Sequence, residues 1–282
     1  GLNRGRFPQA GLASAVLTLY DKEKLTIQDA RGVIRMDAVL LQRLSQITEE
    51  ERELLQGRGV DRALYASGRA FEVDAAKMLE KGKLMSIRPH TRFAPFPRHS
   101  HNYVEIMYMC RGKTVHRIDG DALVTLEAGE LLFLNRHASH AIQRADAGDI
   151  AVNFIVLPQF FDEAFNMAGM DNVLSRFLLG ELYTGGAAVS YLHFRVREVL
   201  PVQNLVENMV WTLVNRQPGA RRINQVTMGL LLLQLMHYTE CIDMSRNGSV
   251  RSPMVEAALR EIEENCRAAS LTDVAAAFHV GL

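Results

Sequence analysis

The pattern of apolar and polar positions divides the chain into a helical start, a strand-rich middle and a helical end. Residues 1–35 show only weak patterning and form an N-terminal extension. Between residues 36 and 82, apolar residues recur at helical spacing. The segment TEEERELLQG opens with Thr48, and Glu51 follows three residues later, which is the spacing of a capping box. Residues 36–82 are therefore predicted to form a helical N-terminal segment.

Between residues 83 and 158 the pattern changes to short segments rich in branched and aromatic side chains. They read KLMSIRPH, YVEIMYMC, TVHRI, ALVTL, ELLFLN and IAVNFIVL. Turn signals that contain glycine separate several of them, and Pro158 ends the last one. Short antiparallel strands at such regular spacing predict a β-sandwich or a β-barrel.

Residues 159–242 return to helical spacing, apart from VSYLHFRV, which is expected to be one outlying strand. Two apolar helices are predicted here, separated by Pro218-Gly219, and Met209 and Leu231 lie in their apolar stripes. Together they carry more apolar surface than one small barrel is expected to cover. The segment is therefore predicted to pair two protomers in a homodimer.

The last part of the sequence begins with a polar linker, residues 243–252. Residues 253–282 follow, with Pro253 at the start of another helical pattern and a second capping box from Ser270 to Asp273. The chain of 282 residues is thus predicted to contain two or three units, which its length can accommodate.

Charge and composition narrow the function classes. The formal net charge is zero, so the chain as a whole has no basic field that would attract nucleic acid. The densest apolar run, GLLLLQLM, is too short to span a membrane. The three cysteines are widely spaced and form no zinc-type pair, which favours reduced thiols in the cytoplasm.

Candidate chemistry is concentrated in the segment HSHNYVE, residues 99–105. If RHSHNYVEIMYM is one strand, its odd-numbered residues point to one side of the sheet. The strand ELLFLN leads through a loop to a further histidine, His140, which could face the same point. A set of imidazoles with one carboxylate suits iron, manganese, nickel, zinc or copper. The predicted metal ligands are His99, His101, Glu105 and His140, and the predicted ligand pocket adds Tyr103 and Met107.

The same residues admit a purely structural interpretation. Buried histidines can form hydrogen bonds with one another and with a buried carboxylate without any metal ion. His90 and His116 lie on neighbouring predicted strands, and each is expected to be a surface or packing residue.

Two segments resemble the cupin motifs. HSHNYVEIMYMCRG fits the first motif, which is His-x-His, three residues, Glu, six residues and Gly, and Gly112 takes the last position. GELLFLNRHASH resembles the second motif through Gly129 and His140. Asn135 and His137 replace the proline and glycine that are usual there, and Phe93 replaces the glycine that usually precedes the first histidine pair. These departures weigh against a catalytic cupin.

The order of segments resembles the AraC/XylS family of transcriptional regulators from about residue 36 to residue 282. The C-terminal segment SLTDVAAAFHV is similar to the start of that family's first helix-turn-helix motif. The resemblance implies a mixed β and α fold: a cupin-like antiparallel β-barrel, a helical dimerisation region and the start of a helix-turn-helix domain. It also implies a small effector, a sugar in many members, and operator DNA as the partner of the longer protein.

Because the recognition helix would follow residue 282, this chain is expected to bind effector and to dimerise without binding an operator specifically. No catalytic residue is predicted. Two alternatives stay open: a metal-dependent cupin enzyme, such as a dioxygenase or isomerase, and a cupin carbohydrate-binding module.

Overall fold

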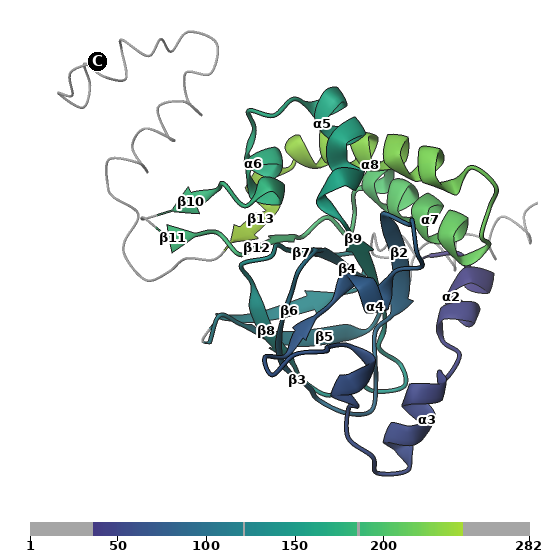
Figure 1. Cartoon of the computed structure of the whole chain (residues 1–282). Helices are drawn as coiled ribbons and strands as arrows, with labels where there is room; N and C mark the ends of the chain where they lie inside the picture. Colours follow the sequence, from purple (N-terminus) through teal and green to yellow (C-terminus); the bar gives the residue numbers. More distant parts are fainter. Residues whose placement is uncertain (1–35, 121, 185–186, 245–282) are drawn as a thin grey trace, which may run out of the picture.

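The computed structural model describes residues 36–120, 122–184 and 187–244 (Figure 1). Two sheets face each other as a flattened barrel, and a layer of helices covers the outer face of one sheet. This arrangement confirms the predicted class, a cupin-like antiparallel barrel followed by helices. The predicted N-terminal extension 1–35, residues 245–252 of the predicted linker and the predicted helix-turn-helix segment at 253–282 lie outside the described residues. The first two residues of the predicted linker, Asp243 and Met244, belong instead to a strand.

The first sheet has five strands in the order β1-β3-β8-β5-β6. Only the pair β1–β3 is parallel in this sheet. The strand bounds, in chain order, are β1 Glu72–Val73, β3 Phe96–His101, β5 Lys113–Ile118, β6 Ala122–Glu127 and β8 Ser139–Ile142.

The second sheet has six strands in the order β13-β12-β7-β4-β9-β2, all antiparallel to their neighbours. A separate hairpin joins two short strands, β10 and β11. The bounds are β2 Met85–Pro89, β4 Val104–Arg111, β7 Leu131–Leu134, β9 Ile150–Val156, β10 Tyr183–Thr184, β11 Ala187–Ala188, β12 Tyr191–Phe194 and β13 Ile242–Met244.

Short helices precede the barrel and longer ones follow it. The α-helices are α2 Ala38–Leu44, α3 Glu49–Leu55, α4 Ala75–Met78, α5 Asp162–Ala168, α6 Val173–Leu179, α7 Leu200–Val214 and α8 Ala220–Met236. Three 3-10 turns cover η1 Arg62–Leu64, η2 Pro158–Phe161 and η3 Thr239–Cys241. The capping box of Thr48 and Glu51 is present at the start of α3. Residues 57–74, predicted as part of a polar helical stretch, are largely irregular and contain β1, so that part of the prediction is wrong.

The structure corrects two strand predictions. RHSHNYVEIMYM is not one strand, because β3 ends at His101 and β4 begins at Val104, and the two belong to different sheets. VSYLHFRV does form the predicted strand, but this strand does not lie apart from the sheets. It provides β12, which lies between β7 and β13. The two sheets of the barrel therefore include strands from outside the interval 83–158, namely β1, β12 and β13.

The two apolar helices α7 and α8 pack against each other and on the outer face of the six-stranded sheet (Figure 1). Val206, Met209 and Leu231 are almost fully buried in the core that these helices share with β4, β7 and β9. Most of the apolar stripe thus stabilises the protomer itself. Several apolar side chains stay exposed on the two helices, namely Leu200, Trp211, Ile223, Val226 and Leu230.

Candidate metal and ligand site

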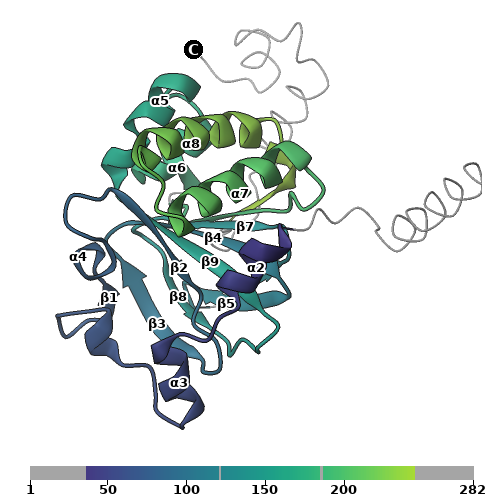
Figure 2. The same ribbon diagram turned by 90° about the vertical axis from the view of Figure 1, so that its right-hand side faces the viewer.

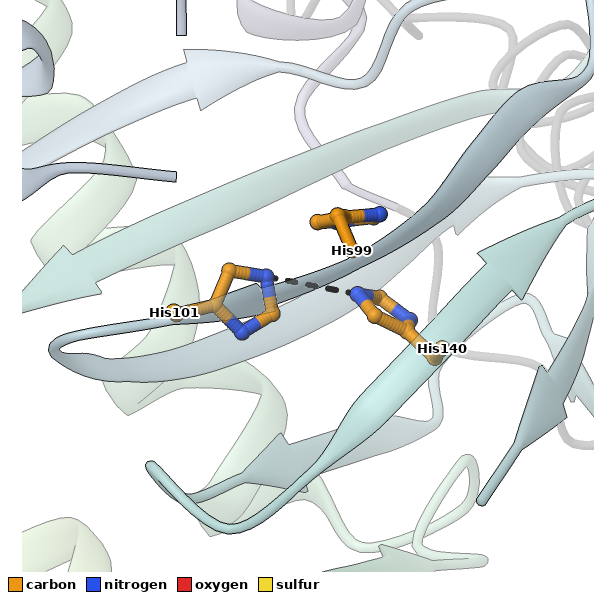
Figure 3. Close-up of side chains that lie close together, drawn as sticks. All are labelled: His99, His101 and His140. Atoms are coloured by element: carbon orange, nitrogen blue, oxygen red, sulfur yellow. Dashed lines mark hydrogen bonds between the residues drawn. The ribbon is translucent and has the colours of Figure 1, made fainter. Parts of the chain in front are cut away.

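The barrel brings four of the predicted side chains together at the corner between its two sheets. His99 and His101 come from β3, His140 comes from β8, and Glu105 comes from β4. His99 and His140 are direct partners in the β3–β8 register. The three imidazoles converge in Figure 3, and their ligand atoms lie within 4.8 Å of one another.

Three polar atoms form a nearly equilateral triangle in this cluster. His101 Nε2 lies 3.3 Å from His140 Nε2. Glu105 Oε2 lies 3.4 Å from His101 Nε2 and 3.5 Å from His140 Nε2. These separations exceed the usual length of a hydrogen bond, about 2.7–3.2 Å. Hydrogen bonding alone therefore accounts poorly for the triangle.

A metal ion accounts for the triangle better. In a tetrahedral zinc site with bonds of about 2.0–2.1 Å, neighbouring ligand atoms lie about 3.3–3.4 Å apart. His101, His140 and Glu105 also supply the nitrogen and oxygen donors that zinc and the other first-row divalent metals accept. Glu105 Oε2 is buried and has no hydrogen-bond partner within the described ranges, so its lone pairs are available to a cation. The residues present fit a metal ion.

His99 is the nearest candidate for a fourth ligand. Its Nδ1 lies 2.8 Å from the Pro97 carbonyl oxygen, and only a protonated nitrogen can donate to that acceptor. The lone pair of the neutral ring is therefore on Nε2. This tautomer leaves His99 able to bind a metal ion or a ligand that enters the cluster.

His116 and Thr114 lie behind the candidate ligand His140 and orient its ring. His116 Nδ1 lies 3.5 Å from His140 Nδ1, and His116 Nε2 lies 2.9 Å from Thr114 Oγ1. A proton on His116 Nε2 satisfies the shorter contact with Thr114, so His116 Nδ1 faces His140 Nδ1 as an acceptor. This arrangement favours a proton on His140 Nδ1 and a lone pair on His140 Nε2. His116 is fully buried and stacks on His140, so its prediction as a surface or packing residue misses its place beside the site. His90 is also buried.

Burial sets the charge of the cluster. It lowers the pKa of His99 to about 4 and the pKa values of His101 and His140 well below 6.5, so these rings are neutral at pH 7. Burial raises the pKa of Glu105 to about 7, although the hydrogen bond from Asn153 opposes that shift. Neutral imidazoles and a carboxylate ready to lose its proton are the states that metal binding requires.

A small cavity of about 30 Å³ opens beside the cluster, which is room for about two water molecules. His99, Tyr103 and Glu105 line it, whereas His101 and His140 do not. Met107 does not line the cavity. It packs in the apolar core inside the barrel, so its predicted contact with the ligand has no support from the cavity lining.

The cavity also has lining residues that the sequence did not single out, chiefly Tyr65, Arg88, His90 and Asn153. Arg88 lies over the Tyr65 ring, 4.6 Å from its centroid, and pairs with Glu50 at 2.5 Å. The Tyr65 hydroxyl donates to the same carboxylate, at 2.5 Å. These contacts fasten the N-terminal segment across the mouth of the cavity. His90 Nε2 and Asn153 Oδ1 are buried there without hydrogen-bond partners among the described residues, so a ligand could bind them.

The barrel matches a known family model, "AraC-like ligand binding domain", over residues 86–165. Residues 86–165 are an AraC-like ligand-binding domain. The match begins in β2 and ends in α5, so it includes all four residues of the histidine and glutamate cluster. It covers well under half of the chain. No curated protein matches the sequence.

Several solved structures are similar to this chain. The apo form of ToxT from Vibrio cholerae strain SCE256 aligns with 10% identity and a TM-score of 0.43, over 72% of this chain and 73% of that one. The AraC-like transcriptional activator CuxR aligns with 12% identity and a TM-score of 0.30, over 64% and 57%. A cupin protein from Bacteroides fragilis aligns with 28% identity and a TM-score of 0.22, over 26% and 64%. With TM-scores below 0.5, these likenesses identify neither the ligand nor the activity of this chain.

Among the described residues, no helix combines the length and the apolar character needed to cross a bilayer.

Proposed function

We propose that this chain is the ligand-sensing and dimerising part of an AraC-type transcription regulator. A small effector would bind in the barrel cavity, beside a divalent metal ion held by His101, His140 and Glu105. The main support for the proposed metal ion is the triangle of ligand atoms, whose edges of 3.3–3.5 Å favour tetrahedral zinc. His99 would be the fourth ligand or would contact the effector. The proposal includes operator DNA as the partner of the regulator, a cytoplasmic location and no catalytic role.

One strand connects the cavity to the helical layer. β4 carries Glu105 on the inner face of its sheet, while Tyr108 lies on the outer face and donates a hydrogen bond of 2.7 Å to Gln203 Oε1 of α7. Gln203 in turn donates to the carbonyl oxygens of Gly129 and Val196. A shift of β4 on effector binding would therefore reach α7 directly. This connection supports a sensor whose occupancy changes the helices.

A reporter fusion tests the proposed function. The full chain would replace the dimerisation domain of a repressor that binds its paired half-sites only as a dimer. We expect repression from the fusion, and a change in repression when the correct effector is added from a panel that includes sugars. A fusion that never represses, although it is folded and abundant, would contradict the dimerisation part of the proposal.

The exposed face of α8 gives the sharpest prediction about assembly. Ile223, Val226 and Leu230 recur at i, i+3 and i+7, so they share one face of the helix, and each is more than a third exposed. We expect Leu230→Glu to convert the dimer to a monomer in sedimentation and to abolish repression by the fusion, because a charge would be buried in an apolar interface. Met209 and Leu231 are unsuitable for this test because both lie in the protomer core.

Leu123→Glu is the matched control for this prediction. Leu123 is exposed on β6, in the sheet that the helical layer does not cover. We expect its substitution to leave the sedimentation of the protein unchanged. A wild-type chain that sediments as a monomer at high concentration, or a Leu230→Glu variant that stays dimeric, would exclude this face as the interface.

A metal-dependent cupin enzyme is the second candidate, because the three ligand atoms would leave one coordination position open to a substrate. Purified protein that contains stoichiometric iron and consumes dioxygen with an organic substrate would favour this candidate. Zinc without turnover would favour the regulator.

A further inference from the structure

The six-stranded sheet ends in β2, and the outer edge of β2 pairs with no other strand in the described part of the chain. Two hydrogen bonds, each 2.9 Å long, flank the pairing of β2 with β9: the Leu157 amide donates to the Leu84 carbonyl, and the His90 amide donates to the Ala151 carbonyl. Since hydrogen-bonded positions alternate along an antiparallel strand, the amides and carbonyls of Met85 and Ile87 point away from β9. None of these four groups has a hydrogen bond among the described residues. Free groups on an edge strand are a template for another strand.

This edge lies in a groove of about 470 Å³ rather than on a flat surface. Leu44 of α2 and Leu213 and Val214 of α7 line one side, and Met78 of α4 lines the other. Figure 2 shows β2 between these helices, with α4 on one side and α2 and α7 on the other. The apolar side chains of the groove would pack against a strand laid along β2.

The groove is lined by more positively charged than negatively charged side chains. Arg43, Lys83 and Arg216 line it together with one carboxylate, Glu80, which Arg216 approaches to 3.7 Å. A second copy of this chain would bring three more cations to the same edge, whereas an acidic segment would neutralise those already present.

We propose that the outer edge of β2 binds an extended, acidic segment of a partner protein by strand addition. The partner would form up to four backbone hydrogen bonds with Met85 and Ile87, because each of these residues offers one amide and one carbonyl. Its carboxylates would pair with Arg43, Lys83 and Arg216, and its aliphatic side chains would contact the apolar walls. This interaction is separate from the effector site and goes beyond the proposed sensing function.

A designed peptide tests the strand addition. The probe is a fluorescein-labelled hexapeptide of alternating glutamate and valine, and fluorescence anisotropy with the full chain measures its affinity. We expect saturable binding, weaker binding at high salt, and binding at least about tenfold weaker when lysine replaces each glutamate. The same peptide with N-methylated amides along one edge should lose binding, because it cannot form the ladder.

Two variants locate the contact. Ile87→Pro removes one outward amide and no hydrogen bond to β9, a position where an edge strand tolerates proline. We expect it to weaken peptide binding about fivefold to tenfold. Lys83→Glu should weaken binding by a similar factor, whereas Lys81→Glu, also exposed but outside the groove, should leave it unchanged. Should Ile87→Pro fail to fold, the Lys83→Glu variant and the N-methylated peptide still test whether the peptide binds along the edge of β2.

Three results would overturn the proposal. The first is no anisotropy change with the acidic peptide at millimolar protein. The second is binding that neither Lys83→Glu nor peptide N-methylation affects. The third is self-association of the chain that Ile87→Pro abolishes and Leu230→Glu does not, which would assign the edge to a second copy.

Discussion

Replacing His140 with glutamine should convert a protein that retains one equivalent of zinc after dialysis into one that retains almost none. His140 Nε2 is one corner of the triangle with His101 Nε2 and Glu105 Oε2, so its loss leaves two corners of the triangle, with His99 as the remaining candidate ligand. Protein zinc sites use three or four protein ligands, so the loss of one of these ligands should weaken zinc binding strongly. Metal analysis by mass spectrometry after dialysis measures the change. We expect removal of the metal by a chelator to lower the melting temperature of the wild type as well.

His137→Gln is the matched control for that experiment. His137 is exposed and lies only three residues before His140, outside the cluster. It should keep the full metal content. Thr114→Val tests the side chains behind His140: loss of the contact with His116 should weaken metal binding about tenfold to a hundredfold. A wild-type protein that purifies without metal and takes up none from added zinc would show that the cluster is a hydrogen-bonded structural feature.

The sequence predicted this cluster partly for the wrong reason. Parity along a single strand would place His99, His101 and Glu105 on one face. In the structure the chain turns at Asn102 and Tyr103, and β3 and β4 enter different sheets. The residues still meet, because the inner faces of two facing sheets enclose the same interior. Spacing alone could not reveal this corner, since nothing in the segment signals a turn as strongly as glycine or proline does.

The partners of the cluster were harder to find than its ligands. Asn153, His116 and Tyr65 belong to segments far from HSHNYVE, and each is brought in by strand pairing or by the return of the N-terminal segment. Of these three, only His116 could be noticed in the sequence, because it is a histidine inside a predicted strand. Similarly, β12 and β13 are short and pair across long stretches of chain, so their place in the six-stranded sheet depends on tertiary packing rather than local pattern.

The motif glycines were predicted well, and the structure explains why. Gly112 and Gly129 both have positive φ values, 79° and 85°. A Cβ at Gly112 would lie 3.0 Å from the Cα of Asp149, and one at Gly129 would lie 2.9 Å from the Cα of Arg197. Backbone conformation and close approach both require glycine at these turns. Turn chemistry of this kind is local, which is why the sequence reveals it.

Glu51→Gln should have the largest effect on stability, a loss of about 3–5 kcal/mol in the free energy of unfolding. Both Glu51 and Arg92 are almost fully buried, and the pair is bidentate, with contacts of 2.7 and 2.8 Å. Arg92 also donates to the carbonyl oxygens of Ser45, Gln46 and Ala147, so it ties the N-terminal segment to the barrel. Removing one charge leaves the other buried without compensation. Urea unfolding followed by circular dichroism measures the change.

Glu49→Gln is the matched control, because Glu49 pairs with Arg52 on the exposed side of the same helix. Its effect should stay below about 1 kcal/mol. Replacing both partners of the buried pair, with Glu51→Leu and Arg92→Met, should cost less than the sum of the single changes, because no uncompensated charge remains. Equal effects of Glu51→Gln and Glu49→Gln would contradict the role given to the buried pair.

The same pair predicts how stability depends on pH. Burial alone would raise the pKa of Glu51, but hydrogen bonds from Arg92 and from the Thr48 amide outweigh it and hold the pKa below 4.5. A carboxyl group whose pKa is lower in the folded protein than in the unfolded chain stabilises the fold fully above the unfolded value. That contribution should disappear as the pH falls from about 5 through the folded pKa. The Glu51→Gln variant has no such group, so the stability gap between it and the wild type should narrow over that interval. A gap that stays constant down to pH 3 would show that the carboxylate charge contributes nothing, and that the cost of the substitution comes from packing.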